Sequence, residues 1–467
     1  MRRPPELPRA RRLAEPGRAR KGLARLLSIL GSARRLPKIP PWRPRSGAMP
    51  YRIPGPREPE PAGPVTVSLA RLGPRVAAAD TCPSRGAIPL DLGQEFPTTW
   101  EEGVASVTAL WKADVERRRF LLDSTFVIGA GSAGIIRWLA EPAGERISAS
   151  GPRRVGVADV AAIREVTRSF SELDNRYGGG YIRGPVVRYL HTAVTPLLRE
   201  GSYGEATGRE LASAAAELTR LAGWMAYDLE QHGLAQRYLL HALGLAKSAG
   251  DHGLGGEILA GLSHQAIYIG HPKHGLELAR AAAVAARRSG VYSLLAEARV
   301  LEAHALALLG DRSSCAVSLH EAERAFDRRS PENEPAWIRY FDEAYLSAKV
   351  AHCLRDLGDG AQAVAHARRS LIMDGRFVRG KMFNLSLLAS ALLQEGELEE
   401  ACSAASAALD LAKGIRSTRT RSYVRDMRRR FAPHATEPCV AELLERVGEY
   451  AGGHSGDHAG RRATVMV

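Results

Sequence analysis

A glycine-rich motif is the most conspicuous candidate for chemistry in this chain. Residues 127–134 read VIGAGSAG and have the G-x-G-x-x-G spacing of a dinucleotide-binding turn, in which backbone amides approach a pyrophosphate. That function needs alternating strands and helices, with an acidic residue about 20 positions on that holds a ribose hydroxyl. The chain continues instead with RISASGPRRVG and then with helical patterns. We therefore interpret the motif as a small-residue connector or helix, and keep a dinucleotide-dependent oxidoreductase as the weaker alternative.

Histidines and cysteines are the other candidates. HPKH, residues 271–274, resembles a metal pair, but no cysteine or acidic ligand converges on it, so we expect a surface loop. No two of the five cysteines have CxxC spacing, and no stretch approaches 18 apolar residues. We expect a non-enzymatic protein without cofactor, metal or membrane span, in a reducing, cytoplasmic compartment. The cysteines are Cys82, Cys315, Cys353, Cys402 and Cys439.

A line of polar residues recurs in register along the second half of the chain. Trp224, His264, His304 and His352, followed by Ser390, each stand six residues before a predicted turn. The histidines titrate near neutral pH, and packed helices lie about 8–10 Å apart, so the three are not expected to share one metal. We predict a groove for a protein, peptide or small ligand, against the alternative of a solvated polar face. Neighbouring groove positions are Arg220, Glu257, Tyr268, Glu297, Lys349, Arg355 and Gln394.

Internal repeats predict the elements that position this line. Turn markers at Glu230, Gly270, Gly310, Gly358 and Gly396 are spaced by 40, 40, 48 and 38 residues. Small residues at three fixed offsets from each marker let paired helices approach closely, which is typical of tetratricopeptide repeats. The sequence therefore predicts an all-α, tetratricopeptide-like solenoid over residues 201–415, with an inserted loop at 328–336. The small residues are Gly223, Ala235, Ala242, Ser263, Gly275, Ala282, Ala303, Cys315, Ala322, Ala351, Ala363, Ser370, Ala389, Ala401 and Ala408.

The positive charge is confined to the N-terminal segment. Residues 1–75 hold 18 of the 65 Lys and Arg but only 4 of the 51 Asp and Glu, which leaves 47 basic and 47 acidic residues elsewhere. Residues 1–80 also contain 15 of the 27 prolines, which disfavour helix. We expect this segment to be disordered, and to act as a solvated tail or as a non-specific arm for nucleic acid or anionic lipid.

Helical patterns flank the repeats on both sides. In the linker region, residues 81–200, a capped helix follows Thr98, a second covers 157–175, GGGYIRGP breaks the chain, and 186–199 resumes the helical pattern. Closing helices are predicted at 420–431 and 439–450, within a capping region at 416–450. Residues 451–467 are polar and predicted to be a disordered tail.

Several segments resemble one family of regulators. They are WMAYDLEQHGLAQRYLLHALGLAKSAGD (224–251), ILAGLSHQAIYIGHPKHGLELARAA (258–282), EPAWIRYFDEAYL (334–346), LAKGIRSTRTR (411–421) and the linker PLDLGQEFPTTWEEGVASVTALWKADVERRRFLL. They resemble the tetratricopeptide portion of actinobacterial regulators with an XRE-type helix-turn-helix, including the NsdA-like negative regulators of sporulation and antibiotic production. The resemblance covers roughly residues 88–447.

The resemblance implies transcriptional control through DNA binding, with a ligand in the repeat groove. Family members carry the helix-turn-helix ahead of the linker, where this chain has its Pro/Arg-rich stretch, and no recognition helix is legible there. Three explanations stay open: the module has been lost, the start or reading frame upstream is wrong, or the module has diverged past recognition. No base-contacting residue is therefore assigned. A scaffold that acts only through protein contacts is the alternative, and a homodimer remains open.

Overall fold

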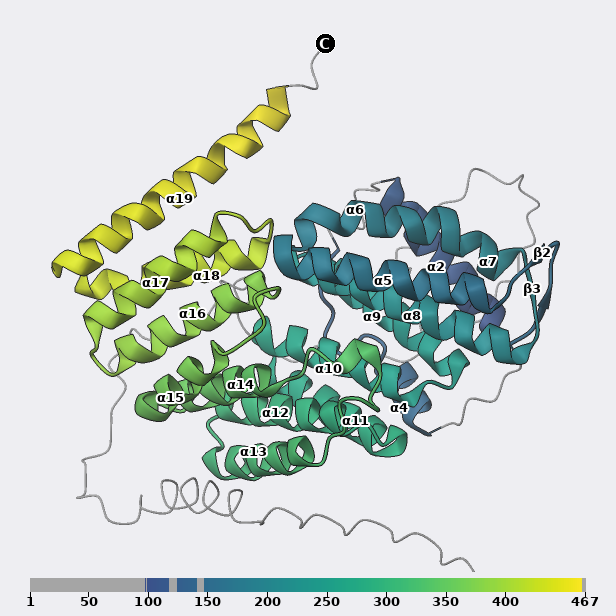
Figure 1. The fold of residues 1–467 in the computed structure, drawn as a ribbon, viewed down its shortest axis with the longest axis horizontal. Coiled ribbons are helices and arrows are strands. Elements are labelled where there is room, and N and C mark those ends of the chain that lie inside the picture. Colours follow the sequence, from purple (N-terminus) through teal and green to yellow (C-terminus); the bar gives the residue numbers. More distant parts are fainter. Residues whose placement is uncertain (1–96, 98, 117–123, 141–146, 464–467) are drawn as a thin grey trace, which may run out of the picture. The chain divides into compact units, whose positions relative to one another are not determined.

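The computed structural model describes residues 97, 99–116, 124–140 and 147–463, and these are almost wholly helical (Figure 1). The predicted all-α class is confirmed, and the basic segment predicted over residues 1–80 lies outside the described residues. The helices are α2 (Trp100–Val115), α4 (Ser132–Ala140), α5 (Val157–Tyr177), α6 (Gly179–Tyr189), the π turn η2 (Leu190–Val194), α7 (Thr195–Arg199), α8 (Glu205–Asp228), α9 (His232–Ala249), α10 (His252–Tyr268), α11 (Pro272–Ser289), α12 (Tyr292–Leu308), α13 (Arg312–Asp327), the 3-10 turn η3 (Ala336–Ile338), α14 (Glu343–Asp356), α15 (Gly360–Ser370), α16 (Val378–Gln394), α17 (Leu398–Ala412), α18 (Thr418–Phe431), the 3-10 turn η4 (Ala432–His434) and α19 (Pro438–Ala463).

Each predicted turn marker adopts the left-handed backbone conformation. The angle φ is +58° at Glu230 and lies between +79° and +86° at Gly270, Gly310, Gly358 and Gly396. A residue with positive φ ends a helix and reverses the chain, and glycine adopts it without steric cost. The markers therefore join α8 to α9, α10 to α11, α12 to α13, α14 to α15 and α16 to α17, and the helices of each pair pack together.

The small residues predicted at these contacts are all buried. At Gly275 of α11, an added Cβ would lie 2.5 Å from Cγ1 of Ile267 in α10. The Ser263 hydroxyl of α10 donates to the Gly275 carbonyl across the same contact (2.7 Å). The two helices are thus too close for any larger side chain, which is the physical reason for the repeated small positions.

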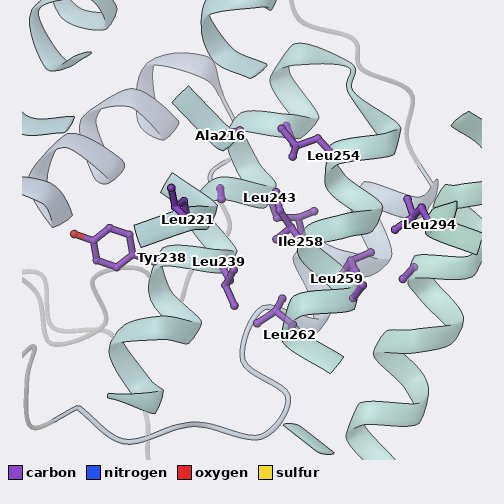
Figure 2. Packing of buried hydrophobic residues seen from close by; sticks show 14 of the residues in the cluster. Ala216, Leu221, Tyr238, Leu239, Leu243, Leu254, Ile258, Leu259, Leu262 and Leu294 are labelled. Carbon is purple, nitrogen blue, oxygen red and sulfur yellow. The ribbon is translucent and has the colours of Figure 1, made fainter. Parts of the chain in front are cut away.

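Large apolar side chains fill the space between successive pairs. Figure 2 shows Leu221 of α8, Leu243 of α9, Ile258 of α10 and Leu294 of α12 within one buried cluster. Each such side chain contributes about 1.5–3 kcal/mol when it leaves water. The apolar faces of the helices therefore hold neighbouring pairs together.

A small sheet, which the sequence did not predict, lies in the linker region. Its strands are β1 (Ala149–Ser150), β2 (Arg153–Arg154) and β3 (Gly201–Tyr203), in the order β1-β3-β2. β3 pairs antiparallel with β1 and parallel with β2. The sheet ties the segment before α5 to the segment before α8.

The first described helix begins at the predicted threonine cap. Thr99 Oγ1 accepts from the Glu102 amide (3.2 Å), and the Glu102 carboxylate accepts from the Thr99 amide (3.3 Å). At the other end of α2, the buried Asp114 pairs with Arg183 of α6 and accepts from the Tyr238 hydroxyl of α9 (2.5 Å). This charged contact fixes α2 against both helices.

The break predicted over GGGYIRGP is wrong for most of its length. Only Gly178, at φ +84°, interrupts the chain; α6 begins at Gly179 and includes Pro185. The Gly179 amide donates to the Asp228 carboxylate at the end of α8 (3.0 Å). Because this acceptor lies far along the chain, local sequence rules could not anticipate the helix start.

Two further local predictions need correction. The tail predicted from residue 451 is helical as far as Ala463, because no proline interrupts α19 after Pro438 and an established helix propagates readily. HPKH is a helix start rather than a surface loop, since α11 begins at Pro272. His271 precedes that helix, and its ring stacks on Phe126 with centroids 5.9 Å apart.

The glycine-rich motif packs as a tight turn on α9. The Gln236 side chain donates to the Val127 carbonyl (2.8 Å) and accepts from the Val127 amide (3.0 Å). Gly129 and Gly131 have φ of +79° and +75°, and a Cβ at Gly131 would lie 2.5 Å from Cδ2 of Leu240. Helix α4 follows directly, and the strands of the described residues lie elsewhere. The glycines therefore serve close packing.

We expect Gly131→Ala to lower the free energy of unfolding by about 1–3 kcal/mol, because it adds strain at positive φ and a clash with Leu240. The matched control is Gly448→Ala in α19, where nothing lies within 4 Å of the added Cβ. That change should stabilise by about 0.5–1 kcal/mol. Urea unfolding of both variants measures the difference, and equal effects would contradict this role for Gly131.

Candidate functional site

The predicted groove residues lie on the first helix of each pair. Helices α8, α10, α12, α14 and α16 carry them, and each of these helices contacts the next. We call this set the polar face. Its members are Arg220 and Trp224 on α8, Glu257, His264 and Tyr268 on α10, Glu297 and His304 on α12, Lys349, His352 and Arg355 on α14, and Gln394 on α16.

Two carboxyl groups meet at one phenol in the middle of the polar face. Tyr340 Oη lies 3.0 Å from Glu257 Oε1 and 2.8 Å from Glu297 Oε2, and both glutamates are 3 % exposed. Arg220 Nη1 is 3.0 Å from the same Glu257 oxygen. A phenol has one proton, so it can donate to only one of these carboxyl groups at a time. Burial raises the pKa of both carboxyl groups.

A buried lysine lies beside this pair. Lys349 is 7 % exposed, and its Nζ lies 5.4 Å from the centre of the Tyr345 ring. Burial lowers the pKa of Lys349 to about 7, although attraction by Glu297 opposes the shift. Its amine is therefore close to half protonated at neutral pH, which an exposed lysine is not.

The three histidines of the polar face are half-buried. The His304 and His352 rings are 5.4 Å apart, and His304 Nε2 lies 3.1 Å from the Asp356 carboxylate. His264 Nδ1 lies 2.9 Å from the Tyr227 hydroxyl. Burial lowers the pKa of all three below its ordinary value of 6.5. The shift runs against the expected titration near neutral pH, which stays a prediction.

The far end of the polar face is held by Arg355. Its guanidinium contacts the Asp356 carboxylate (2.7 Å) and the Ser390 hydroxyl (3.3 Å), and its carbonyl accepts from the Gln394 side chain (3.3 Å). Gln394 is exposed. These contacts join α14 to α16 through polar groups alone.

An arginine from a closing helix occupies the opposite end. Arg419 of α18 is 4 % exposed, and its guanidinium carbon lies 4.4 Å from the Tyr227 ring centre and 5.2 Å from that of Tyr268. The rings of Trp224 and Phe383 complete a box, at 5.8 and 4.8 Å. Desolvated cation–π contacts of this kind contribute about 2 kcal/mol or more.

A buried ion cluster anchors this arginine. The Asp228 carboxylate of α8 lies 3.9 Å from Arg419, 3.0 Å from Arg379 of α16, and accepts from the Ser417 hydroxyl (3.0 Å). Arg379 also pairs with Asp174 of α5 (2.6 Å). Two carboxylates and two guanidinium groups thus share one interior site, where each neutralises the others.

The structure brings the predicted residues together but does not leave them as an open groove. Arg220 meets Glu257, Trp224 meets His264 with ring centroids 5.5 Å apart, and His304 meets His352. Among the predicted residues only Gln394 is exposed. The others are buried or half-buried, and Tyr340 and Arg419 pack against part of the face. Ligand binding there stays a prediction.

Sequence reasoning missed these covering residues. Tyr340 comes from the segment between α13 and α14 that the 48-residue repeat spacing marks as an insertion, and Arg419 lies in the RSTRTR stretch at the start of α18. The insertion was visible in the repeat spacing, and an insertion must pack somewhere. The direction of packing was not encoded locally.

The comparisons with known proteins leave the function to be argued from the residues. Protein-family models give no match to this chain, and neither do the curated proteins. Along the described parts of the chain, no helix has the length and apolar character needed to cross a bilayer. In the same parts, no three His, Cys, Asp or Glu side chains gather as metal ligands would.

Lys349→Met should remove a pH-dependent part of the stability. Unfolded lysine keeps its proton to about pH 10.5, whereas folded Lys349 loses it near pH 7. Between these values the unfolded state binds more protons, so wild-type stability rises with pH by up to about 1.4 kcal/mol per pH unit relative to the variant.

Denaturant unfolding of both proteins at several pH values measures this slope. The exposed Lys413, which pairs with Asp410 at the surface, supplies the control variant Lys413→Met. Identical slopes for wild type and Lys349→Met would mean that Lys349 remains charged in the folded protein.

Arg419→Ala should destabilise the protein by on the order of 3 kcal/mol, because it leaves Asp228 with one cation fewer and empties the aromatic box. Arg428→Ala, at an exposed position of the same helix, should change stability by less than about 0.5 kcal/mol. Thermal unfolding compares the two. If both variants lowered stability by a similar small amount, the ion cluster would not be what holds α18 in place.

Proposed function

We propose that this chain is a cytoplasmic regulatory protein, in which a tetratricopeptide-like solenoid binds a protein, peptide or small ligand and thereby controls transcription. One observation carries the proposal: ionisable and aromatic side chains occupy the same face of successive first helices and are drawn into one buried network. Apolar residues of similar volume would often stabilise such a site as well or better. A costly network of perturbed groups is more typical of a functional site than of a core.

The ligand chemistry follows from the groups that the network holds. Its members are two buried carboxyl groups at one phenol, a lysine with a lowered pKa and an aromatic box around a guanidinium. A ligand with a hydroxyl or a guanidinium group would replace Tyr340 or Arg419 at similar contacts. Residues of the chain itself now fill those positions, so they act as competitors for the ligand.

The regulatory step we propose is a population shift. One state has α18 and the inserted segment, residues 328–342, seated on the polar face, and the other has them displaced. A ligand that binds only the displaced state shifts the balance by as much as its differential affinity. The moved helix then changes the presentation of the DNA-binding element that the family resemblance implies.

A scaffold without DNA binding is the second candidate. It is favoured by the charge balance, because residues 76–467 carry as many acidic as basic side chains. A neutral body gives no electrostatic steering towards nucleic acid. We do not propose a dinucleotide enzyme, since Gly131 of the motif packs against Leu240 of α9.

Binding to promoter-sized duplex DNA over a range of salt concentrations tests the proposal. We expect the full chain to bind with a sequence preference if a DNA-binding element is present, and with a steep salt dependence because residues 1–75 carry the excess positive charge. A chain that starts at Ile88 is the comparison. If only the full chain bound, with a steep salt dependence and no sequence preference, the N-terminal segment would be a phosphate-binding arm and no more. Absence of binding by both would favour the scaffold.

A further inference from the structure

A cavity lies outside the polar face, between α5, α8 and the inserted segment. Its volume is about 500 Å³, within the range of small-molecule sites. Val157 and Val160 of α5 and Ala336 of the inserted segment contribute apolar walls, and Arg164, Glu210 and Glu217 contribute charges. Val157 is 80 % exposed, which leaves an apolar rim facing water. The cavity therefore combines apolar walls with charged side chains, most of which are exposed.

Most charges of the cavity already neutralise one another. Arg164 of α5 reaches Glu210 of α8 at 2.7 Å, and Arg168 lies 3.4 Å from Glu165 on α5 itself. An anionic ligand would have to break one of these pairs to gain an arginine. The arginines are therefore poor candidates for ligand capture.

Glu217 is the exception among the charged residues of the cavity. The described residues supply it with neither a hydrogen bond nor an ion pair, and it is only partly exposed. Arg220, one turn further along α8, is turned away to Glu257 (3.0 Å). Burial raises the pKa of Glu217, with Arg220 and Arg164 opposing. A cation that entered the cavity would favour its charged form.

We propose that this cavity binds a small primary amine with an apolar chain, whose ammonium group pairs with Glu217 while the chain lies against Val157, Val160 and Ala336. A charge-assisted contact in a partly desolvated site is stronger than a neutral one, and the apolar walls add affinity for the chain. The class of ligand is a monovalent cationic amphiphile. This inference does not rest on the proposed regulatory function, because binding at α5 and α8 requires no DNA contact.

Isothermal titration of the full chain with hexylamine, hexanol and hexanoate tests the charge requirement. Hexylamine should bind about ten-fold more tightly than the other two, since only it has both the ammonium group and the chain. Preferential binding of hexanoate would assign the cavity to anions and overturn the proposal. Absence of hexylamine binding at millimolar concentrations, where wild-type protein is folded, would overturn it as well.

Two variants test the residues. Glu217→Gln keeps the shape of the side chain and should weaken hexylamine binding about ten-fold while leaving hexanol unchanged. Glu165→Gln removes the same charge from the same cavity at a paired, exposed position, and should change the affinity less than about two-fold. Equal losses of affinity in both variants would mean that the overall electrostatic potential of the cavity attracts the amine. That outcome would contradict a specific contact with Glu217.

A third variant protects the test against misfolding. Ala161 is exposed and lines the cavity, so Ala161→Trp should fill the space from its rim without disturbing the core. Its thermal unfolding should match the wild type, and it should lose hexylamine binding. Retained binding in a folded Ala161→Trp protein would place the amine elsewhere.

Discussion

The rest of the structure depends on the buried cluster of two carboxylates and two guanidinium groups formed by Asp174, Asp228, Arg379 and Arg419. The four residues come from α5, α8, α16 and α18, which are far apart in the sequence. An ion left without its partner in such an interior costs several kcal/mol, whereas a neutral set is tolerated. We therefore expect the four residues to be buried together or not at all. Their burial requires that the linker region, the first helix pair, the last helix pair and the closing helix all meet.

This requirement explains why the polar face is covered. Because Asp228 holds Ser417 and Arg419, the start of α18 is fixed over the end of α8, and the guanidinium of Arg419 enters the aromatic box. At the middle of the same face, the carboxyl pair needs a hydroxyl, and Tyr340 of the inserted segment supplies it. Each covering element is thus held by the polar groups that it covers.

The difference between what the sequence could and could not predict follows from the range of the interactions. The turn markers and small positions were predictable because a left-handed turn and a close helix contact depend on residues a few positions apart, as at Gly270 and Gly275. The groove residues were found by the same register. Their burial could not be predicted, because the residues that pack on them, Tyr340 and Arg419, are positioned by contacts between segments far apart in the sequence. The low pKa of His304 and the helix start at Gly179 escaped prediction for this reason.

A stack of helix pairs draws its stability from local packing and from contacts between neighbouring pairs, so a costly residue in one pair is tolerated when its neighbours pack well. Here the ionisable network runs across the pairs, and the ion cluster joins the first pair to the last. A disturbance at one end is therefore not absorbed by the nearest pair alone. Displacing Arg419 removes a charge from the site that also holds Arg379 and Asp174, and so reaches α16 and α5. The buried charges cost stability, but they couple the first helix pair to the last.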